Sequence, residues 1–189
     1  MAFKDNHIFY KSAISKHGIS AQGVHWNSEY NQYKRFEVLT CFVKDEIKES
    51  TIVVAGCGFG EYYNYLFDND FKPKSYIGID CEEEMITLAS KRFLNTSFYI
   101  KDIIKDELVF ADYYICSGAM NILKKDEIFI FIKKCFEASN IGFVFNFLKN
   151  DPLTNVNFLD ILHYSKSLSK RVEIKEDYLE NDISIFIKK

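Results

Sequence analysis

Three glycines lie at alternate positions directly after a run of small, mostly β-branched residues. The segment 53–61 reads VVAGCGFGE and contains Gly56, Gly58 and Gly60. Glycine reaches backbone angles that other residues avoid, and it lets a ligand come close to the main chain. In an open α/β sheet, a nucleotide-like ligand binds at the carboxyl end of the first strand. The segment therefore predicts a strand, a ligand-binding turn and then a helix.

The spacing of these glycines excludes two phosphate-binding loops. A dinucleotide loop of the form Gly-x-Gly-x-x-Gly needs a glycine at position 61, which is occupied by Glu61. A carboxylate beside a pyrophosphate would be repelled. The Gly-Lys-Ser/Thr of a Walker loop is also missing after Gly60. The loop suits a ligand that contains adenosine but no phosphate.

Two acidic residues follow the next two expected strands. Asp80 ends the run 75–80, where a carboxylate accepts hydrogen bonds from both hydroxyls of a ribose. Asp102 follows the run 97–101 and is placed to accept from an adenine amino group. Each acid also has a local explanation, Asp80 as a helix cap and Asp102 as a turn residue. Their common position behind the glycine loop favours the binding role.

Apolar spacing along the chain predicts the elements that position these residues. The predicted strands are 51–55, 75–80, 97–101, 112–116 and 141–148, followed by an antiparallel hairpin of 171–175 and 182–188. The predicted helices are 3–14, 61–67, 82–93, 126–138, 156–168 and one that begins near Ser28 and carries Phe36, Leu39, Val43 and Ile47 on one face. This alternation indicates an α/β fold: a doubly wound, mostly parallel seven-stranded sheet with a closing antiparallel hairpin and an N-terminal helical cap. We expect one domain over 1–189, with the cap in 1–48 and the α/β core in 49–189.

Composition narrows the function classes. The chain has 189 residues, 48% of them hydrophobic, and a formal net charge of −3, which does not favour a nucleic-acid partner. No apolar run is long enough for a membrane span, and the first seven residues contain no signal-peptide core. The five cysteines form no Cys-x-x-Cys pair, so neither a metal site nor a disulfide framework is predicted. We expect a cytoplasmic protein with reduced thiols.

With these motifs, the sequence resembles a class I S-adenosylmethionine-dependent methyltransferase over roughly residues 30–189. The matching segments are 56–60, 76–80 with 84–86, 102–103 and 112–118. Segments 32–36, 117–121 and 142–148 resemble a group of uncharacterised bacterial members. The resemblance implies a Rossmann-like methyltransferase fold and S-adenosylmethionine as cofactor. The cofactor-binding residues that it implies are Gly56, Cys57, Gly58, Gly60, Asp80, Cys81, Met85, Asp102, Ile103, Ser117, Gln32 and Arg35.

One position departs from the family pattern. The family usually has an acid two residues before the first glycine, where it helps to hold the methionine end of the cofactor, and this chain has Val54. Either Gln32, Arg35 and the loop backbone compensate, or the chain is a catalytically inactive protein that binds S-adenosylmethionine or S-adenosylhomocysteine. A nicotinamide-linked dehydrogenase is a third reading, which Glu61 and the lack of a substrate domain disfavour.

The methyl acceptor is expected between the N-terminal cap and the ends of the fourth and fifth strands. Methyl transfer from a sulfonium needs in-line positioning more than acid–base groups, so no catalytic residue is predicted. Nucleic-acid amino methyltransferases carry Asp/Asn/Ser-Pro-Pro-Tyr after the fourth strand, whereas this chain has Ser117-Gly118-Ala119, which favours a small-molecule acceptor. The residues expected to line its pocket are Tyr10, His25, Trp26, Asn121 and Asn146, with His163 as a weaker alternative.

Overall fold

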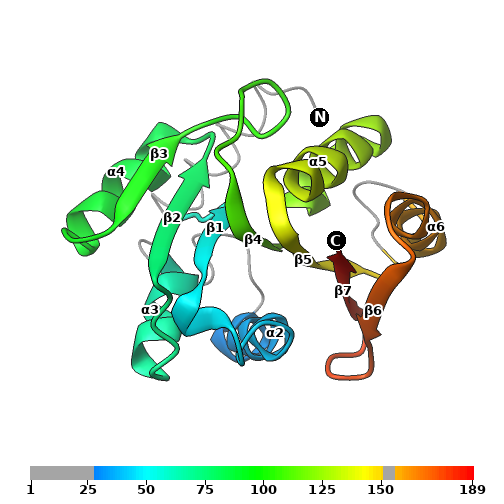
Figure 1. Cartoon of the computed structure of the whole chain (residues 1–189), viewed down its shortest axis with the longest axis horizontal. Coiled ribbons are helices and arrows are strands. Elements are labelled where there is room, and N and C mark those ends of the chain that lie inside the picture. The colour runs from blue at the N-terminus through cyan, green and yellow to red at the C-terminus, as the bar shows by residue number, and fades with distance from the viewer. Residues whose placement is uncertain (1–27, 151–155) are drawn as a thin grey trace.

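The computed structural model describes residues 28–150 and 156–189, and its seven strands form one sheet (Figure 1). The strands are β1 (Thr51–Ala55), β2 (Ser75–Asp80), β3 (Ser97–Ile100), β4 (Ala111–Ser117), β5 (Ser139–Leu148), β6 (Arg171–Lys175) and β7 (Asp182–Lys188). Their order is β3-β2-β1-β4-β5-β7-β6. The pairs within β1–β5 are parallel, while β7 runs antiparallel to both β5 and β6. The predicted doubly wound sheet and its closing hairpin are therefore confirmed.

Helices cover both faces of this sheet. They are α2 (Glu29–Cys41), α3 (Glu61–Asp68), α4 (Glu83–Arg92), α5 (Lys125–Ala138) and α6 (Phe158–Leu168), with the 3₁₀ turns η2 (Ile47–Glu49) and η3 (Ala119–Ile122). Buried side chains of α2, α3 and α4 pack on one face, which we call the α2 face. Those of α5 and α6 pack on the other. The predicted helix 3–14 lies outside the described residues.

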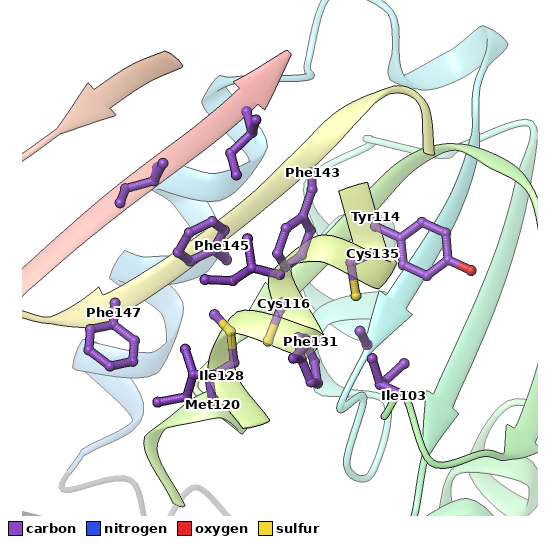
Figure 2. Packing of buried hydrophobic residues seen from close by; sticks show 14 of the residues in the cluster. Ile103, Tyr114, Cys116, Met120, Ile128, Phe131, Cys135, Phe143, Phe145 and Phe147 are labelled. Carbon is purple, nitrogen blue, oxygen red and sulfur yellow. The ribbon is translucent and has the colours of Figure 1, made fainter. Parts of the chain in front are cut away.

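Alternating side chains on the central strands build the two cores. On β5, Phe143, Phe145 and Phe147 belong to the core on the α5 side, and Figure 2 shows them along one strand, with Phe143 in ring contact with Phe131 of α5. Val144, between two of them in sequence, packs in the α2-face core. The apolar run is continuous because a parallel strand covered by helices buries both of its faces.

The helix that begins at Ser28 is shorter than predicted. Its start is confirmed, since the Ser28 hydroxyl accepts the Asn31 backbone N–H at 3.1 Å. It ends at Cys41, yet Val43 and Ile47 are both buried. The following turns and η2 keep these side chains directed inward, so apolar spacing continued beyond the helix itself. Among the described helices, none has the length and apolar content of a membrane span.

Candidate functional site

The glycine loop leaves β1 at its carboxyl end in a conformation that only glycine adopts easily. Gly56, Gly58 and Gly60 have φ angles of +73°, +53° and +80°. In this left-handed region, a β-carbon would be strained. Gly60 is also the residue that precedes α3, so the turn leads directly into that helix. The predicted strand, turn and helix are thus confirmed.

Gly56 also lies so close to the turn after β4 that a larger residue would not fit there. A β-carbon at Gly56 would lie 2.2 Å from the β-carbon of Ala119, in the turn that follows β4. The loop is also tied to β2, since the N–H groups of Gly56 and Cys57 both donate to the Ile79 carbonyl, at 2.8 and 3.0 Å. The ends of β1, β2 and β4 therefore meet at this loop.

Side chains from two helices hold the far end of the loop. Arg92 of α4 donates to the Phe59 carbonyl at 2.9 Å and forms an ion pair with Glu61 at 2.8 Å. The Tyr33 hydroxyl of α2 donates to the other oxygen of Glu61 at 3.1 Å. Glu61, which in the sequence served only to exclude a dinucleotide loop, thus fastens the glycine turn to α2 and α4. No sequence pattern pointed to Arg92.

Asp80 lies at the end of β2 and joins the loop to α4. One carboxylate oxygen accepts the Gly58 N–H at 2.9 Å, and the other accepts the Glu82 N–H at 3.0 Å. Burial raises the pKa of Asp80, and these two backbone donors oppose the shift. The helix-cap and ligand-binding readings of Asp80 are compatible, because each carboxylate oxygen has further acceptor capacity for a ribose hydroxyl.

Further predicted cofactor residues lie around Asp80. The thiol of Cys81 has its pKa raised to about 12, first by desolvation and then by the carboxylates of Asp80, Glu82 and Asp102. Such a concentration of carboxylates suits hydrogen-bond donors such as ribose hydroxyls and an adenine amino group, and it disfavours phosphate. Three further predicted cofactor residues, Cys57, Met85 and Ile103, are buried.

Asp102 makes the turn contacts that its alternative reading requires. Its carboxylate accepts the Ile104 N–H at 2.9 Å and pairs with Lys105 at 2.8 Å. A role toward adenine stays a prediction, and it would use acceptor capacity beyond these two contacts.

Unpartnered polar atoms gather where the acceptor was expected. Of the described residues, four have a buried side-chain oxygen without a hydrogen-bond partner, and three of these are Ser117 Oγ, Asn121 Oδ1 and Asn146 Oδ1. Ser117 ends β4, Asn121 is in η3 directly after it, and Asn146 is the register partner of Ser117 on β5. Buried polar atoms are normally paired. Three orphans at adjoining strand ends therefore indicate a place for a polar ligand.

Beside Asn146 lies a buried ion pair. Arg35 of α2 contacts both oxygens of Asp182, at 2.5 and 2.8 Å, and Asn146 Nδ2 donates to the same carboxylate at 3.3 Å. Arg35 is 6% exposed and Asp182 only 2%. The guanidinium charge of Arg35 is thus balanced within the protein. The predicted contacts of Arg35 and of the buried Gln32 with a cofactor stay predictions.

Several other predicted residues lie elsewhere. Tyr10, His25 and Trp26 are outside the described residues. His163 is exposed on α6, which packs on the face opposite α2. Within residues 28–150 and 156–189, no group of His, Cys, Asp and Glu side chains could hold a metal ion.

The segment that contains the glycine loop and these strand ends matches a known protein family. Residues 52–142 match a family model described as a methyltransferase domain. No curated protein matches the sequence significantly. The matched segment contains the glycine loop, Asp80, Asp102 and the end of β4.

Solved structures share the fold at low sequence identity. The plantazolicin methyltransferase BpumL in complex with SAH has a TM-score of 0.71 at 11% identity, covering 99% of this chain and 91% of its own. The magnesium protoporphyrin IX methyltransferase of Synechocystis PCC 6803 with bound SAM has a TM-score of 0.68 at 16% sequence identity. The match covers 84% of this chain and 79% of that protein. A TehB-like SAM-dependent methyltransferase of Corynebacterium glutamicum has a TM-score of 0.65 at 17% sequence identity, and the match covers 98% of this chain and 97% of that protein. The predicted Rossmann-like methyltransferase fold is therefore confirmed.

Proposed function

We propose that this chain, which contains a class I methyltransferase domain, binds S-adenosylmethionine and transfers its methyl group to a small-molecule acceptor. The observation that carries the proposal is the unit formed by the glycine loop and Asp80. Three left-handed glycines expose the backbone at the end of β1, and a carboxylate from β2 is hydrogen-bonded to the middle one. Two of the similar structures contain the same type of ligand, SAM in one and SAH in the other.

The residues present fit this cofactor. Asp80 would accept the ribose hydroxyls, and the half-buried Asp102 would face the adenine amino group. The glycine loop would leave room for the adenosine close to the main chain. Ser117 would receive a polar group of the methionine end, which would satisfy a hydroxyl that lacks a partner in the described structure.

The protein's part in the chemistry is positioning. When bound, the cofactor supplies an activated methyl group on a sulfonium. The chain has to hold the acceptor in line with that group, which accounts for several kcal/mol of barrier in well-oriented reactions. Asn121 and Asn146 lie where the ends of β4 and β5 would face such an acceptor, and a general base is required only for an acceptor with a high pKa.

An inactive binding protein is the second candidate, and one observation favours it. Val54 occupies the position of the usual acid, and its side chain is 2% exposed within the apolar core of the α2 face. The described structure therefore has an apolar group where the family has a carboxylate. A protein of this kind would bind the adenosyl ligands without turnover.

Methyl-labelled S-adenosylmethionine separates the two candidates. The protein would be incubated with it and with either the small-metabolite fraction or the nucleic-acid and protein fractions of a bacterial lysate. We expect labelled product and S-adenosylhomocysteine only with the small-metabolite fraction. Label in a macromolecular fraction would contradict the small-molecule acceptor. Binding without product in any fraction would favour the inactive protein.

A further inference from the structure

We propose that Asn146 directs its carbonyl oxygen at the methyl acceptor, that the Arg35–Asp182 pair positions it, and that the acceptor is an amine. This inference rests on the proposed function and names the substrate class of the same site. It starts from a buried polar layer on the α2 face of the sheet. Along β5 and β7, Asn146 and Asp182 lie in phase with core residues of that face, because alternate residues of a strand share a side.

The amide of Asn146 is held at one end only. Its Nδ2 donates to Asp182, whereas its Oδ1 has no partner among the described residues. This orientation follows from the bond to the carboxylate, since a carboxylate only accepts and the amide must turn its nitrogen toward it. The carbonyl oxygen is thereby left for a donor from outside the layer. Asn146 is completely buried, so an unpaired oxygen there is costly until a ligand satisfies it.

The ion pair is better explained by positioning than by stability. A buried pair gains little over apolar side chains of the same size, because both charges lose their hydration. Here it replaces such side chains in a layer whose neighbours include Val144 and Phe186. What the pair does provide is a fixed carboxylate, with both oxygens contacted by Arg35, that sets the rotamer of Asn146.

The groups around Asn146 point to the chemistry of the acceptor. Asn121 in η3 also has an unpartnered amide oxygen, so beyond Ser117, which is assigned to the methionine end, this place offers two acceptors and needs a ligand with N–H or O–H groups. No described group near Asn146 is suited to take a proton from an alcohol. The charge of Asp182 is balanced by Arg35, and burial raises the pKa of Tyr178, whose hydroxyl shares a hydrogen bond with Ser184. A neutral amine needs no such base, since its lone pair is already available.

The reaction then balances without a further reactant. The amine nitrogen donates N–H groups to the amide oxygens of Asn146 and Asn121, and its lone pair forms the bond to the methyl carbon. The carbon–sulfur bond breaks and its electron pair stays on sulfur, which gives S-adenosylhomocysteine. The methylated nitrogen releases one proton to water.

Sinefungin tests this inference without knowledge of the acceptor. In this adenosyl analogue an amine-bearing carbon replaces the methyl-bearing sulfonium, so it presents N–H groups toward the acceptor side. Calorimetric Kd values for sinefungin and for S-adenosylhomocysteine give a preference ratio. We expect wild-type protein to prefer sinefungin by about tenfold or more, and Asn146→Leu to lose that preference. Ser184→Ala is the matched control, because Ser184 is buried and lies opposite Asn146 on β7, and it should keep the wild-type ratio.

The positioning role has its own variant. Asp182→Asn keeps the shape of the side chain but leaves Arg35 and Asn146 to share one carbonyl oxygen, so we expect the ratio to fall while the protein stays folded. A general loss of stability would weaken both ligands equally and leave the ratio unchanged. If Asp182→Asn keeps the wild-type preference for sinefungin, the Arg35–Asp182 pair does not position Asn146. If Asn146→Leu keeps that preference, the assignment of an amine acceptor is wrong. If neither ligand bound the wild-type protein, the proposed function itself would fail.

Discussion

Replacing Asp80 with asparagine is expected to abolish most of the cofactor binding while the free protein stays folded. In the structure, the two carboxylate oxygens each accept one backbone N–H, from Gly58 and from Glu82. Asparagine keeps one acceptor and turns its NH₂ group toward the other N–H. Against that loss stands the relief of a buried charge, since burial raises the pKa of Asp80. We expect the free energy of unfolding to change by about 1 kcal/mol or less, because these two effects oppose each other.

Ligand binding should respond much more strongly. Two ribose hydroxyls donating to a carboxylate contribute about 3 kcal/mol together, so their loss raises Kd about 100-fold. At about 100 times the wild-type Kd, S-adenosylhomocysteine stabilises the wild-type protein by about 2.7 kcal/mol. For a domain of this size that is a rise in Tm of roughly 5–11 °C. The same concentration should stabilise Asp80→Asn by only about 0.4 kcal/mol, or roughly 1–2 °C.

Thermal unfolding with and without S-adenosylhomocysteine measures both effects. Asp160→Asn is a suitable control, because Asp160 is an exposed aspartate on α6 that pairs with Lys125. It should show the full wild-type rise. A full rise in Asp80→Asn as well would refute the assignment of Asp80 to the ribose.

Three further predictions concern the same region. Free wild-type protein should gain stability relative to Asp80→Asn as the pH falls from 7 toward about 4. The reason is that Asp80, with its raised pKa, binds a proton more readily in the folded chain than in the unfolded chain. Parallel profiles of Tm against pH for the two proteins would contradict this. Gly58→Val should cost about 1–2 kcal/mol of stability at a φ of +53° and prevent adenosyl binding, and a wild-type calorimetric Kd would remove the loop from the site. Val54→Asp should lower the Tm of the free protein without tightening S-adenosylhomocysteine, since its side chain lies in the α2-face core, whereas a lower Kd would show that the missing acid limits the site.

Local sequence signals were sufficient for most of the fold. The bounds of β1 and β2 match the prediction, because each is a short apolar run bordered by a glycine turn or by polar residues. The two strands of the hairpin were equally clear from their alternation. At 29–47 the same reasoning failed in part, since periodicity reports which side chains face inward and not whether the backbone between them stays helical.

The placement of the candidate site residues was predictable where they follow strands and unpredictable where they meet across the fold. Asp80 and the glycine loop each follow a strand, and parallel strands bring their carboxyl ends to one edge. Arg35 and Asp182 are 147 positions apart; Arg35 was expected at the cofactor, and nothing in the sequence singled out Asp182 as its partner. Their contact depends on how α2 crosses β7, which involves the packing of the whole α2 face. The ion pair between Arg92 and Glu61 likewise depends on how the helices pack, which local sequence patterns do not report.

The most direct test of the central claim is a thermal-shift titration of the wild-type protein with S-adenosylmethionine, S-adenosylhomocysteine and NAD in parallel. The glycine loop with Asp80 and without a phosphate-binding residue predicts a rise in Tm with both adenosyl compounds and none with NAD. A rise with NAD, or none with either adenosyl compound, would contradict the account.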